Sequence, residues 1–330
     1  MQAAVLYRPH DLRIEERPDP TTPPPGHALV AVTHVGLCGS DVHYYEHGRI
    51  ADFVLRAPMI LGHEAAGRVV ALGQGVTGPA VGTTVAIEPG IPCGRCPSCL
   101  SGRYNLCPDV RFLATPPIDG ALVHHLVHPA HLLFDAGDLP ASRAWMAEPA
   151  SVAVHALRRA RVELGQRVAV FGAGAVGLFT AMAAEAAGAR VWLYDVDGRR
   201  VEGAKTLGIR AALFPPEADT RVDIAFDCSG AGPAIHLLPE IVRPGGTVVL
   251  VGLGTPEAMA VDGLAVAARE LTVMGVMRYA NTYPAALALL TRFRERIDRL
   301  PLTTIGMNDL PAHLAEARYR KSVKTMVEVV

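Results

Sequence analysis

The chain has 330 residues, of which 50% are hydrophobic and only 19% are charged. At about 150 residues per domain this length predicts two domains, and the composition excludes a largely disordered chain. Lys and Arg number 31 against 32 Asp and Glu, so a net charge of −1 provides no positive field for binding nucleic acid or an anionic membrane. We therefore expect a globular protein that acts on a small molecule.

Six cysteines occur in a chain whose first residues, MQAAVLYRPHDLRIEERPDP, contain no charged-then-apolar leader. This pattern indicates a cytoplasmic location, where cysteines serve metals or chemistry rather than disulfides. The most apolar uncharged stretch, residues 168–184, is shorter than the roughly 20 residues that cross a bilayer, and glycines interrupt it. No transmembrane helix is expected.

The first half of the sequence has the pattern of a mainly β domain. Short alternating runs are separated by turns, such as the proline-rich turn at residues 23–26. Helical spacing follows at residues 142–161, and the pattern changes after Gly165, so we place a domain boundary near residue 150. The strands expected in this half are residues 3–8, 11–16, 27–35, 67–72 and 83–88.

The second half alternates strand-like and helix-like segments. Its apolar, β-branched runs are typical of a parallel sheet covered on both faces, which predicts a doubly wound α/β unit. The expected strands are residues 167–172, 191–196, 222–228, 246–253 and 271–277, and the expected helices are residues 178–188 and 234–242. A helix at residues 283–297 and a strand at residues 324–330 are too short to form a domain and are expected to rejoin the first half. The expected domains are residues 1–150 with 279–330, and residues 151–278.

The segment FGAGAVGL at residues 171–178 indicates a nucleotide cofactor. Gly172, Gly174 and Gly177 form the pattern G-x-G-x-x-G between an expected strand and an expected helix. The first glycine permits a tight turn, the second lets the backbone approach a pyrophosphate, and the third permits close helix packing. Asp195, which ends the next strand, would bind the adenosine ribose and repel the extra phosphate of NADP, so NAD is expected. Arg200 lies close enough in sequence to tolerate that phosphate, and a glycine turn without nucleotide is the alternative.

Four cysteines lie in one short segment with the spacing C-x2-C-x2-C-x7-C: Cys93, Cys96, Cys99 and Cys107. Zinc favours four tetrahedral thiolates in structural sites, and a complete set of protein ligands leaves no position for chemistry. We expect a structural zinc in a lobe spanning residues 90–110. An iron–sulfur cluster or a disulfide pair is the alternative.

A second candidate metal site is dispersed over Cys38, His63, Glu64 and Glu148. A cysteine, a histidine and a carboxylate can hold zinc while leaving a position for water or substrate, which a catalytic site requires. Spacing alone does not establish this site, because a lone cysteine or histidine in a strand-rich region is more often part of the core.

The motif GHEAAGRVVALGQGV at residues 62–76, the four-cysteine lobe and the glycine pattern together resemble the zinc-dependent medium-chain alcohol dehydrogenase family over essentially the whole chain. Segments at residues 38–54, 102–108, 112–122 and 277–284 are similar to its sorbitol (polyol) dehydrogenase branch. The resemblance implies a Rossmann doubly wound parallel sheet inserted in a mainly β GroES-like catalytic domain. It also implies NAD and two zinc ions per chain, one catalytic and one structural.

The resemblance implies a role for each residue of the dispersed site. The catalytic zinc falls on Cys38, His63 and Glu64, with Glu148 either a fourth ligand or hydrogen-bonded to the zinc-bound water. Asp41 is the implied partner of the His63 imidazole. Ser40 and His43 stand where the family places a proton relay, and contacts with substrate hydroxyls fall on Tyr44, Glu148, Arg278 and Tyr279. The implied cofactor-binding residues are Gly172, Gly174, Val176, Gly177, Asp195, Arg200, Val251, Leu253, Val276 and Met277.

The implied reaction is that of a polyol 2-dehydrogenase, which oxidises a secondary hydroxyl of a sugar alcohol such as sorbitol or xylitol to a ketose by hydride transfer to NAD. One alternative is another zinc-dependent alcohol or threonine dehydrogenase of the same fold. The other is a non-catalytic nucleotide-binding protein. The resemblance further implies a homo-dimer or homo-tetramer, with strand edges at residues 271–277 as one contact.

Two segments depart from the family pattern. Where the family commonly has G-D-R-V, this chain has G-T-T-V at residues 82–85, and we have no functional account of the difference. The stretch FPPEADTR at residues 214–221 is short for a link between parallel strands, which normally contains a crossover helix of a dozen or more residues. At about 3.3 Å per residue an extended link would reach roughly 25 Å. We therefore expect no helix there.

Overall fold

The computed structural model describes residues 1–329 and forms two compact units. Unit 1 is Met1–Glu148 with Pro301–Val330, and unit 2 is Pro149–Leu300. The first boundary lies next to the expected one. At the second boundary, residues 279–300 group with unit 2 rather than with the first domain, so the expected division is corrected there. Val330, which ends both the expected last strand and the expected first domain, lies outside the described residues.

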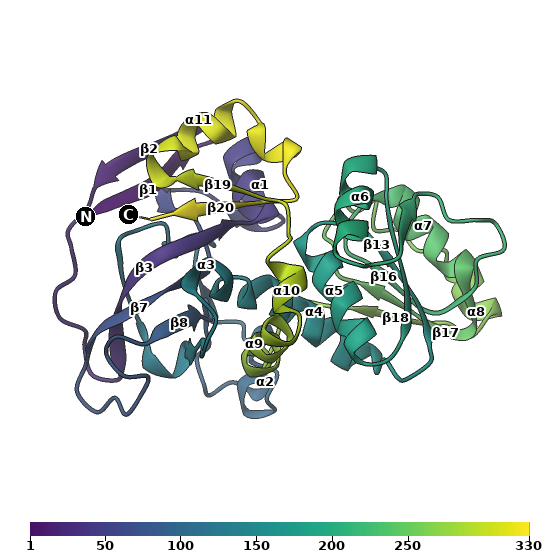
Figure 1. Cartoon of the computed structure of the whole chain (residues 1–330), viewed down its shortest axis with the longest axis horizontal. Coiled ribbons are helices and arrows are strands. Elements are labelled where there is room, and N and C mark those ends of the chain that lie inside the picture. The colour runs from purple at the N-terminus through teal and green to yellow at the C-terminus, as the bar shows by residue number, and fades with distance from the viewer. Residues whose placement is uncertain (330) are drawn as a thin grey trace. The chain divides into compact units, whose positions relative to one another are not determined.

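Unit 1 is built around a seven-stranded sheet with β3 (His27–Leu37) near its centre. One edge of β3 pairs with β7 (Glu64–Leu72), and the other pairs with β20 (Lys324–Glu328) and β11 (His125–Pro129), all antiparallel. The last strand of the chain therefore lies beside a strand from its first half (Figure 1). The sheet is completed by β8 (Thr84–Ile87), β12 (Leu133–Asp135) and β19 (Leu302–Gly306), and a second sheet holds β1 (Gln2–Arg8), β2 (Asp11–Glu16) and β6 (Met59–Ile60).

The core of unit 1 joins side chains from both sheets. Val5 and Leu6 of β1 and Val30 and Val32 of β3 belong to one buried cluster and are at most 2% exposed. Burial of such apolar surface is the main favourable contribution to folding, at roughly 25 cal/mol per Å².

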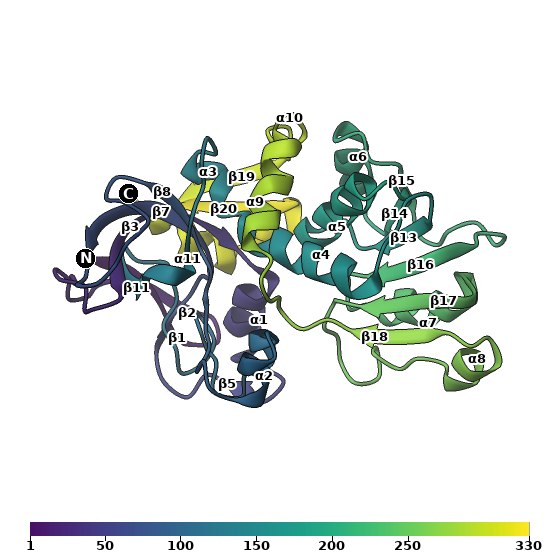
Figure 2. The ribbon, with the colours of Figure 1, turned by 90° about the horizontal axis from the view of Figure 1, so that it is seen from below.

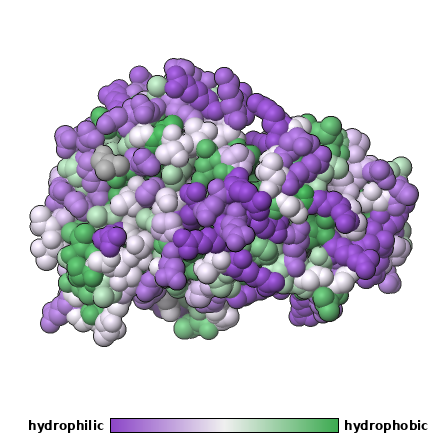
Figure 3. Space-filling model, viewed as in Figure 1, coloured by the Kyte–Doolittle hydropathy of each residue, from purple (hydrophilic) through white to green (hydrophobic). Residues whose placement is uncertain are grey.

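On the face seen in Figure 3, hydrophilic residues predominate and hydrophobic residues form scattered patches. Among the described residues, no helix has the length and apolar character needed to cross a membrane.

Short helices connect these strands. The main ones are α1 (Gly39–His47), α2 (Pro97–Leu100), α3 (Ala141–Ala144), α4 (Ala147–Ala160) and α11 (Leu310–Ala315). The helical run expected at residues 142–161 is thus two helices, α3 and α4, and α4 continues from unit 1 into unit 2.

Unit 2 contains a six-stranded sheet with the order β15-β14-β13-β16-β17-β18, in which every neighbouring pair is parallel. Numbered within the unit this order is 3-2-1-4-5-6, which is that of a doubly wound dinucleotide-binding sheet. Val168 and Phe171 point to opposite faces of β13 and are each at most 1% exposed, so both faces of the sheet are covered. The strands are β13 (Arg167–Phe171), β14 (Arg190–Asp195), β15 (Ala211–Leu213), β16 (Val222–Asp227), β17 (Val242–Leu250) and β18 (Thr272–Gly275).

Helices pack against this sheet at successive strands. Helix α5 (Ala175–Ala186) packs against β13 and β14, and α7 (Gly232–Ile241) packs against β16 and β17 (Figure 2). The remaining helices are α6 (Gly198–Thr206), α8 (Gly263–Ala268), α9 (Tyr283–Arg292) and α10 (Arg294–Ile297). The single helix expected at residues 283–297 is interrupted at Phe293, whose φ of −105° and ψ of 24° leave the helical region.

The link between β15 and β16 contains no helix, which confirms the expectation for residues 214–221. The two strands are separated in the sheet by β14 and β13, so the link crosses two strands. It contains one turn, closed by a hydrogen bond of 3.0 Å from the N–H of Thr220 to the carbonyl oxygen of Glu217.

Candidate metal and nucleotide sites

Cys38, His63 and Glu64 are brought together by the pairing of two strands. Cys38 follows β3 and precedes α1, whereas His63 precedes β7 and Glu64 is the first residue of that strand. Because Gly36 of β3 lies opposite Glu64, the end of one strand meets the start of the other. One potential ligand atom from each of the three side chains lies within 4.8 Å of the other two. Gly36, which no sequence pattern marks, permits this approach, because a Cβ there would lie 2.2 Å from Glu64 Oε2.

Asp41 supports this group through hydrogen bonds to the backbone. It is fully buried, and its carboxylate accepts hydrogen bonds from the backbone N–H groups of Cys38 at 2.9 Å and Gly62 at 3.0 Å. Its Oδ1 also lies 3.9 Å from Nδ1 of His63, too far for a direct hydrogen bond but close enough for charge attraction. Asp41 therefore fixes the backbone on both sides of the site and faces the imidazole, as the resemblance implies.

Lys324 is a member of the group that sequence reasoning missed. Its Nζ lies 2.5 Å from Glu64 Oε1, and the two side chains are only 10% and 1% exposed. Burial lowers the pKa of Lys324, but the negative charges of Glu64, Cys38 and Glu148 outweigh burial and raise it overall. No local pattern in the C-terminal strand marks this lysine, because its partner is 260 residues away in the chain.

The electrostatic field at this site favours positive charge. Burial lowers the pKa of His63, but the neighbouring Cys38, Asp41 and Glu148 raise it to about 10. Two buried ligand-type atoms, Nδ1 of His63 and Oε2 of Glu64, have no hydrogen-bond partner among the described residues. Unpaired buried polar atoms are costly, and a thiolate, an imidazole and a carboxylate are ligands that zinc accepts. The residues present therefore fit a zinc ion.

Glu148 lies in the first turn of α4 and is 6% exposed. It is not one of the three side chains whose ligand atoms cluster within 4.8 Å, but its charge acts on both His63 and Lys324. The structure thus places Glu148 near the group without bringing it into the cluster itself.

Three further predicted residues lie on α1. Tyr44 is 2% exposed, Ser40 is half-buried, and His43 is exposed, with its ring 4.6 Å from that of His47. Partial burial and the neighbouring His47 lower the pKa of His43, and Glu46 offsets part of that effect. Ser40 and His43 are three residues apart and therefore share one face of the helix.

The four cysteines of the lobe form one cluster, as their spacing predicts. Sγ of Cys99 lies 3.4 Å from that of Cys96 and 3.9 Å from that of Cys93. Zinc–sulfur bonds of about 2.3 Å set sulfur–sulfur distances in a tetrahedron near 3.8 Å, whereas a disulfide requires about 2.05 Å. Backbone N–H groups of Arg95 and Cys96 lower the pKa of the Cys93 thiol to about 7, which favours the thiolate. The geometry fits a metal and not a disulfide.

Glu88 ties this lobe to the main sheet, a role that the sequence analysis did not foresee. The side chain is 2% exposed, and its Oε1 accepts a hydrogen bond of 2.7 Å from the Tyr104 hydroxyl in the lobe. Burial and the charge of Glu148 raise the pKa of Glu88 to about 7, although the bond from Tyr104 lowers it. The backbone carbonyl of Glu88 accepts a hydrogen bond of 2.8 Å from Nε2 of the buried His128.

The three glycines of unit 2 occupy the turn between β13 and α5. Gly172 has a φ of 101°, a conformation that L side chains rarely adopt. A Cβ on Gly177 would lie 1.8 Å from the carbonyl oxygen of Gly172, so the helix packs directly on the turn. A Cβ on Gly174 would meet nothing within 4 Å, so open space lies over the N-terminus of α5. Space and unpaired backbone N–H groups at a helix N-terminus are what a pyrophosphate requires.

Asp195 ends β14 and holds the glycine turn. It is 7% exposed, and its carboxylate accepts hydrogen bonds from the N–H groups of Ala173 at 2.7 Å and Asp197 at 2.9 Å. Nη1 of Arg200 lies 4.0 Å from Asp195 Oδ2. A carboxylate and a guanidinium therefore stand together beside the turn, as the sequence predicts.

The remaining predicted cofactor residues follow the carboxyl ends of parallel strands. Val251 follows β17, and Val276 follows β18, with its N–H bonded to Leu250 at 2.9 Å. Leu253 is 70% exposed and Met277 is 36% exposed. In open parallel sheets nucleotides bind at this edge, where the strand order reverses. Val176 lies in the first turn of α5, while Arg278 and the buried Tyr279 follow in unit 2.

Asp227 orders the same edge and was also missed. It is fully buried at the end of β16, and its carboxylate accepts hydrogen bonds from Ser229 Oγ at 2.6 Å and from the N–H of Gly230 at 3.0 Å. In the sequence Asp-Cys-Ser-Gly, a carboxylate acceptor stands two residues before a serine and three residues before a glycine. This pattern is a signal that could have indicated the turn. Cys228 donates a long bond of 3.8 Å to Thr180 and belongs to neither metal cluster.

Family models and known proteins are similar to this chain over most of its length. The alcohol dehydrogenase GroES-like domain model matches residues 24–138, and the zinc-binding dehydrogenase model matches residues 175–292. The chain is 42% identical over 317 residues to a sorbitol dehydrogenase of Gallus gallus, covering 92% of this chain and 88% of that protein. It is 38% identical to a probable D-xylulose reductase A of Neosartorya fischeri, covering 98% and 95% of the two chains.

A solved structure supports the same assignment. An oxidoreductase/dehydrogenase of unknown specificity from Escherichia coli superimposes with a TM-score of 0.91 at 34% identity, covering 99% of this chain and 98% of that one. Relatives at this identity and coverage share the whole fold. The chain therefore belongs to the zinc-dependent medium-chain alcohol dehydrogenase family, in the branch that contains the sorbitol dehydrogenases, and is an oxidoreductase.

Proposed function

We propose that the chain is a zinc-dependent NAD polyol 2-dehydrogenase that oxidises a secondary hydroxyl of a sugar alcohol, such as sorbitol or xylitol, to a ketose. The observation that carries the proposal is the buried group of Cys38, His63 and Glu64. Three protein ligands leave a coordination position open for a substrate oxygen. Relatives named for sorbitol and D-xylulose supply the substrate class.

Cys38, His63 and Glu64 would hold the catalytic zinc, with Glu148 as a fourth ligand or as a hydrogen-bond partner of the bound water. Zinc at this site supplies Lewis-acid chemistry that lowers the pKa of the substrate hydroxyl. Asp41 supports the site by holding the backbone of Cys38 and Gly62. Cys93, Cys96, Cys99 and Cys107 would hold the structural zinc.

Ser40 and His43 would carry the substrate proton to solvent. The half-buried Ser40 lies toward the start of α1, and the exposed His43 shares its helix face. The lowered pKa of His43 keeps its imidazole neutral near pH 7, so that it can accept a proton. Its exposure then allows transfer to bulk water.

NAD would bind at the glycine turn of unit 2. The pyrophosphate would lie over Gly174 at the N-terminus of α5, and Asp195 would accept hydrogen bonds from the adenosine ribose. Arg200 is the residue that would tolerate a phosphate if NADP entered. The other proposed cofactor contacts are Gly172, Val176, Gly177, Val251, Leu253, Val276 and Met277.

Tyr44, Glu148, Arg278 and Tyr279 are the proposed contacts for the hydroxyls of the substrate. Each hydroxyl of a polyol needs its own donor or acceptor, and these four side chains offer both kinds. We also propose a homo-dimer or homo-tetramer in the cytoplasm. The six free cysteines are consistent with a reducing compartment.

A substrate screen combined with metal analysis on one sample tests the proposal. NADH formation would be followed with sorbitol, xylitol, threonine and ethanol, and zinc would be counted per chain. We expect a polyol to exceed threonine and ethanol by at least tenfold in kcat/KM. Cys38→Ser is expected to lose most turnover and one zinc equivalent, while Cys228→Ser, which alters a thiol outside both clusters, keeps both equivalents. Faster turnover of threonine or ethanol would point to the other dehydrogenases of this fold.

A further inference from the structure

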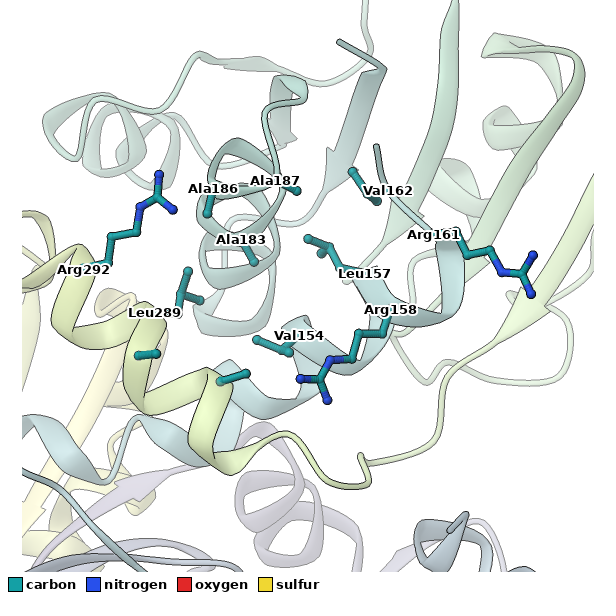
Figure 4. A pocket seen from close by; sticks show the side chains of 12 residues that line it. Val154, Leu157, Arg158, Arg161, Val162, Ala183, Ala186, Ala187, Leu289 and Arg292 are labelled. Carbon is teal, nitrogen blue, oxygen red and sulfur yellow. The ribbon is translucent and has the colours of Figure 1, made fainter. Parts of the chain in front are cut away.

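Unit 2 contains a cavity of about 410 Å³ that none of the candidate site residues lines. It lies among the second half of α4, the end of α5 and helix α9 (Figure 4). The volume falls in the range of about 300–1,000 Å³ that is typical of small-molecule sites. Glu148 lies in the first turn of α4, whereas the cavity residues of that helix begin at Val154.

The lining of the cavity is divided sharply between apolar and cationic side chains. Nine of the twelve lining residues are Ala, Val or Leu, and the other three are Arg158, Arg161 and Arg292. Small side chains on facing helices, such as Ala183 of α5 and Ala288 of α9, leave the open space. No carboxylate, amide or hydroxyl side chain is among the twelve. The composition therefore suits an apolar ligand with an anionic end.

The arginines exceed what the local helices require. Helices α4, α5 and α9 all end near this cavity, and each C-terminus carries about half a negative charge. Three such ends sum to about −1.5 against three guanidinium charges, which leaves about +1.5. None of the three arginines forms a salt bridge within residues 1–329, and Glu185 on α5 is already paired with Arg296 at 2.7 Å. The cavity consequently retains a net positive potential.

The three arginines flank the apolar floor of the cavity. Nη1 of Arg158 donates a hydrogen bond of 2.7 Å to the backbone oxygen of Asn281, which fixes the side chain while leaving its other N–H groups available. In Figure 4, Arg292 stands on one side of the alanine-lined floor, and Arg158 and Arg161 stand on the other. The planar guanidinium group matches a carboxylate in shape and charge.

We propose that this cavity binds an amphipathic monocarboxylate, with its hydrocarbon chain on the alanine and leucine floor and its carboxylate on the rim arginines. The nine apolar lining residues supply a surface for the hydrocarbon chain, and the guanidinium groups supply the positive charge that a carboxylate pairs with. The site is independent of the zinc and NAD chemistry proposed above.

Calorimetric titration of the full-length, zinc-loaded protein with octanoate tests this site, with 1-octanol and acetate as ligands that lack the charge or the chain. We expect octanoate to bind one site per chain, at least tenfold more tightly than either control ligand. The double variant Arg158→Gln/Arg292→Gln is expected to weaken octanoate binding at least tenfold. Ala288→Trp fills the space from an exposed position and is expected to abolish binding.

Matched variants keep the test specific. Arg159→Gln removes an exposed charge beside Arg158 that does not line the cavity, and Ala268→Trp adds the same bulk at an exposed position of α8. Both are expected to bind octanoate like the unaltered protein, as is Cys38→Ser. The proposal is wrong if octanoate does not bind, or if cavity variants bind it normally. It is equally wrong if Cys38→Ser abolishes binding. It is also wrong if Ala288→Trp dissociates an oligomer, since a second copy of the chain would then occupy the cavity.

Discussion

Lys324 Nζ and Glu64 Oε1 form a buried ion pair, 2.5 Å long, between the C-terminal strand and the first residue of β7. Glu64 is also one of the three side chains that fit the catalytic metal. Removing one member of a buried ion pair leaves the other charge uncompensated, which costs about 3–5 kcal/mol. The C-terminal strand thereby contributes directly to the electrostatics of the metal site.

Lys324→Met should therefore destabilise the protein by about 3 kcal/mol after chelation of zinc, and by less when zinc is bound, because the metal would then offset the charge of Glu64. Urea denaturation under both conditions measures the difference. Lys205→Met provides the matched control, since Lys205 pairs with Glu202 on an exposed helix surface at 2.7 Å. That variant should lose less than about 1 kcal/mol in either condition. Equal losses in the two variants would contradict the role assigned to Lys324.

The two glycines of the cofactor turn should respond differently to the same added methyl group. Gly174→Ala places a Cβ in open space, so the protein should keep its Tm while losing at least tenfold in NAD affinity, because the pyrophosphate would occupy that space. Gly177→Ala places a Cβ 1.8 Å from the oxygen of Gly172, so it should lower Tm as well as affinity. Calorimetry with NAD and thermal denaturation separate the two effects. A normal Tm for Gly177→Ala would contradict the packing.

The pair of Asp195 and Arg200 should set the choice between NAD and NADP. Asp195→Asn removes the negative charge and leaves one side-chain oxygen, which can accept from the N–H of Ala173 or from that of Asp197 but not from both. We expect the ratio of kcat/KM for NAD over NADP to fall at least tenfold, because Arg200, 4.0 Å from Asp195, is then free to bind the phosphate. Asp197→Asn is the control, since this residue caps α6 and pairs with Arg199. An unchanged ratio in Asp195→Asn would refute the assignment.

Glu88 should make stability depend on pH. Burial raises the pKa of its carboxyl from 4.5 to about 7 in the folded protein. Between these values the folded state binds more protons than the unfolded state, so this residue's contribution to stability decreases as pH rises from 4.5 to 7 and is constant above that. The full cost at neutral pH is about 3 kcal/mol, at about 1.4 kcal/mol per pKa unit.

Glu88→Gln keeps an acceptor for the Tyr104 hydroxyl but does not titrate. The stability of this variant minus that of the unaltered protein should rise by up to about 3 kcal/mol between pH 4.5 and 7.5 in urea denaturation. His128 has a pKa lowered to about 4 by burial and titrates in the opposite sense, but it is present in both proteins and cancels in the difference. A difference that does not change with pH would show that folding does not raise the pKa of Glu88.

Features that depend on neighbouring residues could be predicted from the sequence. The parallel strands of unit 2, the glycine turn and the four-cysteine lobe are each encoded by a contiguous pattern of side chains or by a fixed spacing. The missing helix at residues 214–221 also follows from sequence alone, because chain length limits what a link can contain. The dispersed ligands were identified through the resemblance and not through their spacing.

The tertiary structure decided everything that depends on which distant segments pair. The register of β3 with β7 brings Cys38 to His63 and Glu64, and the pairing of β20 with β3 delivers Lys324 to a partner 260 residues away. Residues 279–300 joined unit 2 because their packing, not their periodicity, sets the boundary. Local patterns report which face of an element is apolar, but they do not encode its partner. Length and local patterns therefore indicated two domains and metal-binding cysteines, whereas strand pairing brought the residues of the site together.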